Sequence, residues 1–198
     1  MVMTAKEKET TALHEAGHAL VTMNMPAHDP LHKVTIIPHG RAMGATLSLP
    51  ERDRYGFARK ELEAKLAILF GGRVAEELIF GPDNLTTGAT DDIKQATKLA
   101  RRMITEFGFS EKLGPLCYGG EDRDVLTEYG FGRRTDISED TAKLIDSETR
   151  SLVEQSQTKA RTILSSHISQ LKLLAAALLE SETLSGEQIE QLLSRKAA

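Results

Sequence analysis

The spacing of apolar residues in the first quarter of the chain predicts a helix followed by a short β-hairpin. Apolar positions recur with helical spacing over residues 4–25, and two prolines shortly after them would end the helix. Residues 33–37 are rich in β-branched side chains, and residues 45–49 alternate apolar and hydroxyl side chains, so both are expected to be strands. Pro50 follows the second strand, which favours a position at the edge of a sheet.

The middle of the chain is predicted to form two further helices. Residues 55–80 have a helical pattern that is apolar on nearly every side near Phe70, which indicates one buried central helix. A Gly-Pro pair directly after it would end that helix. A third helix is expected from Thr90 or Asp91, because apolar residues keep helical spacing from there to Phe107.

A long loop and a second set of helices are predicted for the rest of the chain. Residues 108–135 are rich in glycine and polar side chains and show no period. From Asp136 the pattern is helical again, with Asp136 and Glu139 placed as a capping box. Ser185 and Gln188 are placed to cap a last short helix.

These elements predict a mainly α fold with a small β-hairpin or sheet and a C-terminal helical bundle. Its 198 residues and 40% hydrophobic content suit a soluble globular chain that can bury a core. We expect one domain over residues 1–198, in which residues 1–107 and the helices of residues 136–198 are joined by the loop of residues 108–135.

Charge and cysteine content narrow the classes of partner. The formal net charge is −4, and Lys and Arg are scattered among Asp and Glu, so no nucleic-acid partner is expected. A single cysteine, Cys117, excludes an intrachain disulfide and a multi-cysteine metal site, and it fits a reducing compartment. The sequence has no run of 18 apolar residues and has charged residues near its start, so neither a membrane span nor a signal peptide is expected.

The sequence His14-Glu15-Ala16-Gly17-His18 lies in the middle of the first predicted helix. Residues four apart share one helix face, so both imidazoles can reach one metal ion. Two neutral imidazole nitrogens suit Zn²⁺, and Glu15 lies where it can take a proton from a water molecule at the metal. The HExxH pattern therefore predicts a zinc site together with its general base.

A coincidental HExxH pattern on an amphipathic helix is the alternative interpretation. Two features argue against it. Apolar residues surround the histidines, and Gly17 costs a helix interior about 1 kcal/mol relative to alanine, which usually has a packing or functional reason.

The third metal ligand is not settled by spacing alone. The extended metzincin motif needs Gly at position 21 and His at position 24, and this chain has Val21 and Asn24 there. Glu76 or its neighbour Glu77 is one candidate, because a carboxylate in a nearly apolar helix is costly to bury without a partner. Asp92 is the other, although the helix dipole alone favours an aspartate in a first turn.

Five sequence blocks, in order along the chain, resemble the peptidase domain of the FtsH family of membrane-anchored, ATP-dependent zinc proteases. The blocks are HEAGHAL (14–20), HKVTIIPHGRAMGAT (32–46), GGRVAEELIFG (71–81), TTGATDDIKQATKLAR (86–101) and GFSEKLGP (108–115). The resemblance implies a helical zincin-type peptidase domain and a zinc metalloendopeptidase activity.

The resemblance also implies the roles of individual residues. In the family the third ligand is the aspartate of a TTGAxND pattern, which corresponds to Asp92 here, and Glu76 corresponds to a carboxylate that supports a zinc-bound histidine. The chain departs from the family pattern at Asp91, where asparagine is usual, and at His39, where arginine is usual. The ligands would then be His14, His18 and Asp92, with one zinc ion per chain.

The expected function is degradation of unfolded or misassembled proteins by attack of water on the peptide bond, with Glu15 as the general base. The predicted edge strand, Gly44, Ala45, Thr46, Leu47, Ser48 and Leu49, could pair with an extended substrate through main-chain groups. It could equally be an edge strand that only covers the core. A catalytically silent helical module for ring assembly, with a structural zinc site, is the alternative function.

The resemblance further implies parts and partners outside this chain. FtsH proteins have transmembrane helices and an ATPase module before the peptidase domain, and this chain has no GxxxxGK[ST] motif, so ATP would be used only by that other module. The full-length protein is expected to be a homo-hexamer that acts on polypeptide substrates and contacts the membrane through other segments. Its peptidase domain would face a reducing, cytoplasm-like compartment, with the bacterial cytoplasm favoured.

Overall fold

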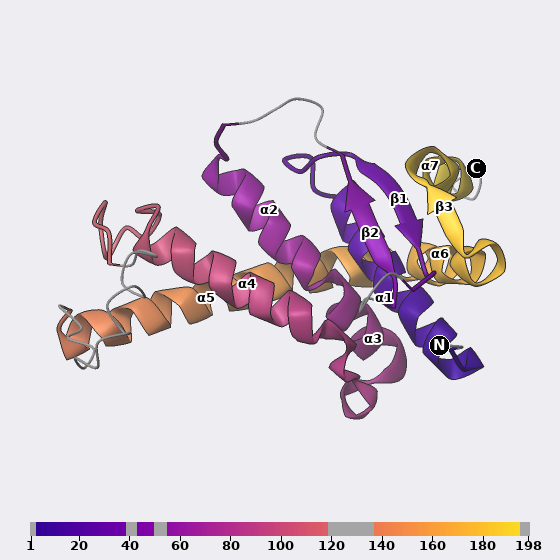
Figure 1. The fold of residues 1–198 in the computed structure, drawn as a ribbon, viewed down its shortest axis with the longest axis horizontal. Coiled ribbons are helices and arrows are strands. Elements are labelled where there is room, and N and C mark those ends of the chain that lie inside the picture. Colours follow the sequence, from indigo (N-terminus) through magenta and orange to yellow (C-terminus); the bar gives the residue numbers. More distant parts are fainter. Residues whose placement is uncertain (1–2, 39–42, 50–54, 119–136, 195–198) are drawn as a thin grey trace, which may run out of the picture.

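The computed structural model describes residues 3–38, 43–49, 55–118 and 137–194 (Figure 1). The elements, in chain order, are α1 (Ala5–Met23), β1 (Leu31–Thr35), β2 (Ala45–Ser48), α2 (Arg59–Leu69), α3 (Gly71–Phe80), η1 (Pro82–Asn84), η2 (Thr87–Ala89), α4 (Thr90–Thr105), α5 (Glu139–Ser166), α6 (Ile168–Ser181), β3 (Thr183–Ser185) and α7 (Gly186–Ser194). Helices dominate and the strands form one small sheet, which confirms the predicted mainly α fold.

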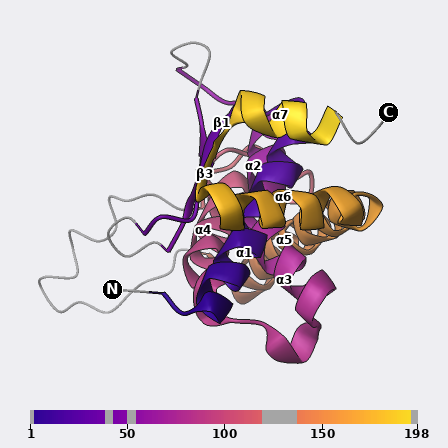
Figure 2. The same ribbon diagram turned by 90° about the vertical axis from the view of Figure 1, so that its right-hand side faces the viewer.

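Helix α1 lies at the centre of the fold. It begins with a capping box, in which the Thr4 hydroxyl accepts a hydrogen bond from the Glu7 backbone N–H and the Glu7 carboxylate accepts one from the Thr4 N–H. Most of residues 11–22 are buried, with α3 and α6 as the main neighbours. Figure 2 shows α6 crossing in front of α1, with α7 above α6 in this view.

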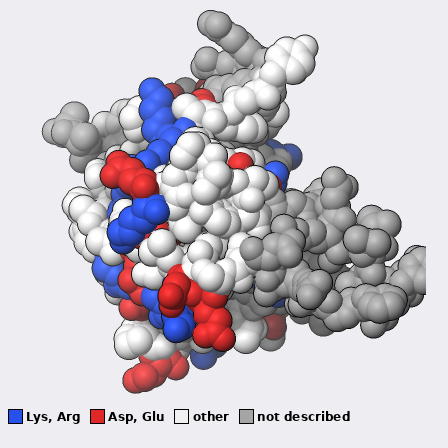
Figure 3. All heavy atoms as spheres, turned by 90° about the vertical axis from the view of Figure 1, so that its left-hand side faces the viewer, with Lys and Arg blue, Asp and Glu red and all other residues white. Residues whose placement is uncertain are grey.

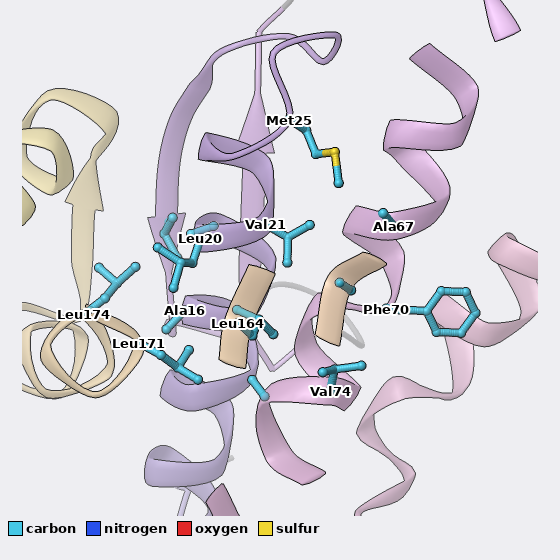
Figure 4. Packing of buried hydrophobic residues seen from close by; sticks show 14 of the residues in the cluster. Ala16, Leu20, Val21, Met25, Ala67, Phe70, Val74, Leu164, Leu171 and Leu174 are labelled. Atoms are coloured by element: carbon cyan, nitrogen blue, oxygen red, sulfur yellow. The ribbon is translucent and has the colours of Figure 1, made fainter. Parts of the chain in front are cut away.

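One hydrophobic core joins the N-terminal and C-terminal helices. Figure 4 shows Leu20 of α1 in one cluster with Val74 of α3, Leu164 of α5 and Leu171 of α6. Burial of a large aliphatic side chain stabilises a fold by about 1.5 to 3 kcal/mol. The division of the chain at residues 108–135 stays a prediction, because residues 119–135 lie outside the described part.

The sheet has the order β2-β1-β3, with both pairs antiparallel. In the predicted hairpin Val34 lies opposite Thr46, and the register shifts between Leu31 and Lys33. The predicted edge position of the second strand agrees with this order, in which β2 has a neighbouring strand on one side only among the described residues. Strand β3 was not predicted, since its three residues are too short to show a period of two.

The prediction of one helix over residues 55–80 is wrong. Helix α2 ends at Leu69, and α3 begins at Gly71 after Phe70, whose φ and ψ are −87° and −7°. The break has a packing cause, because α3 crosses α1 so closely that Gly71 lies against the backbone of Gly17. A straight helix could not place residues on both sides of Phe70 against the same part of α1.

The C-terminal helices differ in detail from the prediction. Helix α5 begins at Glu139, and its N-cap is Ser138, whose hydroxyl accepts a hydrogen bond from the Thr141 N–H. Asp136, the predicted cap, lies outside the described residues. The predicted cap of the last helix is confirmed, since the Gln188 N–H bonds the Ser185 hydroxyl at 3.2 Å and the Ser185 N–H bonds the Gln188 side chain at 2.8 Å.

Within the described ranges, no single helix has the length and apolar content needed to cross a membrane. Only α5 and α6 taken together have the length and apolar content that a membrane span needs, and the chain bends by 85° between them.

Charged side chains of both signs are mixed on the face shown in Figure 3. Several of the ion pairs join neighbours along one helix, such as Arg59 with Glu63 in α2 at 2.8 Å and Arg102 with Glu106 at 2.9 Å. Exposed pairs of this kind contribute about 0 to 1 kcal/mol each. The hydrophobic core therefore stabilises the arrangement of the helices more than the surface charges do.

Candidate metal centre

His14 and His18 lie one turn apart on α1 and point toward the same place. Their rings make an edge-to-face contact with centroids 4.7 Å apart, and their Nε2 atoms are 3.0 Å from each other. The two side chains are nearly buried, with exposed fractions of 12% and 10%. The helical geometry expected from the HExxH spacing therefore brings both imidazoles together.

Three glycines make room for these rings and for the helix crossing behind them. A Cβ atom on Gly17 would lie 2.4 Å from the Gly71 carbonyl oxygen and 2.6 Å from the Ala75 side chain. A Cβ atom on Gly72 would lie 2.3 Å from Nε2 of His14. Gly17 thus has the packing reason that its cost in a helix interior suggested, and Gly72 leaves the space that the His14 ring fills.

Asp92 brings a carboxylate to the two imidazoles from the first turn of α4. Its Oδ2 atom lies 3.2 Å from Nε2 of His14 and 3.4 Å from Nε2 of His18. Of the described residues, His14, His18 and Asp92 form the one group of three potential ligands close enough to share a metal ion. The neighbouring Asp91 faces solvent, with an exposed fraction of 84%, and pairs with Lys94 at 3.4 Å.

Hydrogen bonds on the far side of each ring set its orientation and tautomer. Nδ1 of His18 lies 2.7 Å from the Ile68 carbonyl oxygen, which can only accept, so Nδ1 carries the proton. Nδ1 of His14 lies 2.7 Å from Oε1 of Glu76 and donates to that carboxylate. Each ring therefore presents Nε2, the nitrogen that remains for a metal ion, toward the other Nε2 and Asp92.

Glu76 is buried, and other hydrogen bonds hold its carboxylate in place. Only 1% of the residue is exposed, and its Oε2 atom accepts hydrogen bonds from the Thr86 backbone N–H at 3.1 Å and the Thr86 hydroxyl at 2.9 Å. Thr86 precedes η2, the short turn that leads into α4 and Asp92. Neighbouring Glu77 instead pairs with Arg161 of α5 at 2.7 Å. The two adjacent glutamates thus have different roles, one at the site and one between helices.

The charges around the rings favour a cation. Burial lowers the pKa of His14, but hydrogen bonds to Asp92 and Glu76 and the charge of Glu15 outweigh burial and raise it to about 9. Burial raises the pKa of Asp92, and the hydrogen bonds from His14 and His18 outweigh this effect and lower it well below its usual value. The pKa of Glu76 is also lowered, because its hydrogen bonds from His14 and Thr86 exceed the opposing effect of burial. The carboxylates therefore stabilise positive charge at the centre of the cluster.

The donor atoms fit a tetrahedral zinc ion. The distances between the three atoms are 3.0, 3.2 and 3.4 Å. Two ligands about 2.0 to 2.1 Å from a tetrahedral centre lie about 3.3 Å apart, so the cluster needs little movement to bind zinc. Two imidazole nitrogens and one carboxylate oxygen are also donors that zinc accepts, and three protein ligands leave one position open.

Glu15 lies between this cluster and strand β2. The residue is 7% exposed, and its Oε2 atom accepts a hydrogen bond from the Thr46 hydroxyl at 2.7 Å. The predicted substrate-binding strand therefore lies next to the predicted base. Met43, Leu47 and Leu49 on and beside this strand have exposed fractions of 44 to 52%.

Sequence reasoning named His14, Glu15, His18, Glu76, Asp92 and the edge strand, and the structure brings all of them to one region. It did not name the Ile68 carbonyl, because a backbone acceptor has no sequence signature. Gly72 and Thr86 lie within two of the five sequence blocks, but their residue types alone assign them no role. His39, a departure from the family pattern, lies outside the described residues.

Comparisons with known proteins identify the relatives of this chain. The model of peptidase family M41 matches residues 1–192. The chain is 50% identical over 193 residues to the ATP-dependent zinc metalloprotease FtsH of Caulobacter vibrioides, and 48% identical over 196 residues to that of Haemophilus influenzae. These alignments cover 98% and 99% of this chain but 31% of each relative, so the chain spans less than a third of their length. By its match to the family model over nearly its whole length, the chain belongs to peptidase family M41.

Proposed function

We propose that this chain is the zinc-dependent endopeptidase module of a larger ATP-dependent protease. The observation that carries this proposal is the meeting of His14, His18 and Asp92 beside the carboxylate of Glu15. Membership of peptidase family M41 supports a peptidase activity, and the names of the relatives support zinc as the metal.

His14, His18 and Asp92 would hold the zinc ion, and Glu76 and the Ile68 carbonyl would keep the imidazoles in the binding tautomer. When bound, zinc increases the acidity of water and polarises a carbonyl oxygen. Glu15 accepts the proton of the attacking water and then donates it to the amine that leaves. No covalent enzyme intermediate is required by this set of residues.

The substrate is proposed to be an extended polypeptide that pairs with the edge of β2 that has no partner among the described residues. This strand pairs with β1 on one side and lies within hydrogen-bond distance of Glu15 through Thr46. Pairing through main-chain groups would give low sequence selectivity, which suits degradation of unfolded or misassembled proteins. The exposed Leu47 and Leu49 offer apolar contacts to such a chain.

The properties of the whole protein follow from the same family relationship. We propose one zinc ion per chain, ATP use by a separate module, and assembly as a homo-hexamer. The peptidase module would face a reducing, cytoplasm-like compartment, with the bacterial cytoplasm favoured, and other segments would anchor the protein in a membrane.

The test is metal analysis and cleavage of unfolded casein by the same preparation. Glu15→Gln should keep the zinc and lose about 10² to 10⁴ in rate, because an amide is not a base. The matched control is Glu154→Gln, since Glu154 is an exposed residue of α5. Cleavage that persists in the presence of a zinc chelator would contradict a zinc-dependent activity. Near-normal turnover by Glu15→Gln would exclude Glu15 as the base. A chain that binds zinc yet never cleaves casein would favour the silent assembly module.

A further inference from the structure

The carboxylate of Glu15 is held by a side chain of the edge strand. The Thr46 hydroxyl lies 2.7 Å from Oε2 of Glu15 and 3.3 Å from the Glu15 backbone oxygen. A hydroxyl has one proton to donate, and the shorter contact with the charged acceptor is the stronger of the two. Thr46 therefore donates to the carboxylate, and within the described ranges no other hydrogen bond to this carboxylate is made by a side chain or backbone group.

Gly44 confines the same carboxylate from a second direction. A Cβ atom on Gly44 would lie 2.8 Å from both Cγ and Oε1 of Glu15, and 2.8 Å from the Thr35 carbonyl oxygen. Gly44 and Thr46 are two residues apart, so they lie on one face of the extended chain, whereas Leu47 between Thr46 and Ser48 is 44% exposed on the other. One face of this strand thus forms a cradle for Glu15.

Such a cradle matters because a glutamate side chain has several rotatable bonds. Helix α1 fixes the backbone of Glu15 but not the rotamer of its carboxylate. A charge-assisted hydrogen bond favours one rotamer, and occupying Oε2 leaves Oε1 for a water molecule. A displacement of a reacting group by about 1 Å can cost about 100-fold in rate.

We propose that Thr46 is a positioning residue that holds the base Glu15 in its working rotamer. The inference rests on the proposed peptidase function. It gives strand β2 two roles, since one edge of the strand would pair with the substrate while its inner face orients the base. Binding of the substrate and placement of the base would then depend on the same four-residue strand.

The kinetic test compares Thr46→Val, which keeps the shape but removes the hydroxyl, with Thr46→Ser, which keeps the hydroxyl. In the zinc-loaded protein, Thr46→Val should lower kcat for casein-derived peptides by about 10 to 100-fold, with KM and zinc content nearly unchanged. Thr46→Ser should restore most of the rate. Thr162→Val is the matched control, because Thr162 is exposed and its hydroxyl donates to the Thr158 carbonyl within α5.

A binding measurement separates positioning of the base from pairing with the substrate. In the Glu15→Gln background, adding Thr46→Val should leave the Kd of a peptide substrate unchanged. A rise in KM and in this Kd without a fall in kcat would assign Thr46 to substrate binding and overturn the proposal. An unchanged kcat in Thr46→Val would overturn it as well.

Crystal structures of the same variants give a readout that does not need activity. The Glu15 carboxylate should leave its Thr46-facing position in Thr46→Val and keep it in Thr46→Ser. The same single position in both variants would contradict the proposal. A wild-type protein without chelator-sensitive cleavage would refute the proposed function alone, because the crystal structures would still decide whether Thr46 positions Glu15.

Discussion

Two neighbouring residues of α1, His14 and Glu15, are held in different ways. The His14 ring is fixed from behind by a buried glutamate, which Thr86 supports in turn, and a glycine leaves it just enough space. The Glu15 carboxylate depends on one hydroxyl from an edge strand. The two proposed histidine ligands thus lie at the crossing of α1 and α3, while the proposed base depends on the part of the fold that would meet the substrate.

This difference predicts that substitutions at the crossing of α1 and α3 cause loss of the metal. Substitutions in β2 should reduce turnover while the metal stays bound. Variants at the helix crossing, each with a matched control, test the first expectation, and the variants of Thr46 test the second.

The largest effect is expected for Asp92→Ala. This change removes the one proposed ligand that does not come from α1, so the protein should lose most of its zinc and all measurable cleavage. Asp91→Ala is the control, because Asp91 is exposed and pairs with Lys94. Metal analysis after dialysis and the casein assay check both variants. If Asp92→Ala retains zinc and Asp91→Ala loses it, Asp91 is the third ligand in place of Asp92.

The next effect is expected for Gly72→Ala. A methyl group there would overlap the His14 ring, so the ring must leave the cluster or α3 must move, at a cost of about 1 to 3 kcal/mol in stability. Zinc affinity should fall at least tenfold, as measured by competition with a chromogenic chelator. Gly56→Ala is the control, since no heavy atom of the described residues, its chain neighbours aside, lies within 4 Å of the position of its Cβ. Equal zinc affinities in the two variants would show that His14 does not need this space.

A smaller effect is expected for Glu76→Gln. The amide keeps the shape but removes the charge that orients and polarises His14, and such losses typically weaken metal binding by about 10 to 100-fold. Glu77→Gln removes the adjacent carboxylate, which pairs with Arg161, and should leave zinc affinity unchanged. The same chelator competition measures both. A complete loss of zinc in Glu76→Gln with retention in Asp92→Ala would make Glu76 the ligand.

Much of the site was accessible from the sequence because its parts are local. The i, i+4 spacing of His14 and His18 needs only a helix, and the capping motif of α7 needs only three residues of separation. Spacing left Glu76 and Asp92 as competing ligands, and the family resemblance was needed to choose between them. The structure shows why both residues were plausible ligands, since the two carboxylates contact different nitrogens of the His14 ring.

The remaining features depend on packing between distant segments. The end of α2 at Leu69 reflects the close approach of Gly71 to Gly17, and a window of sequence shows only that residues near Phe70 are apolar. The contact of Thr46 with Glu15 requires knowledge of where β2 lies against α1. Neither relation could be derived from the pattern of either segment alone.

The most direct test of the metal centre is anomalous diffraction at the zinc absorption edge from crystals of the zinc-loaded protein. We expect one peak per chain within about 2.0 to 2.2 Å of Nε2 of His14, Nε2 of His18 and a carboxylate oxygen of Asp92. A peak ligated by Glu76 or Asp91 in place of Asp92, or no peak beside His14 and His18, would contradict the account.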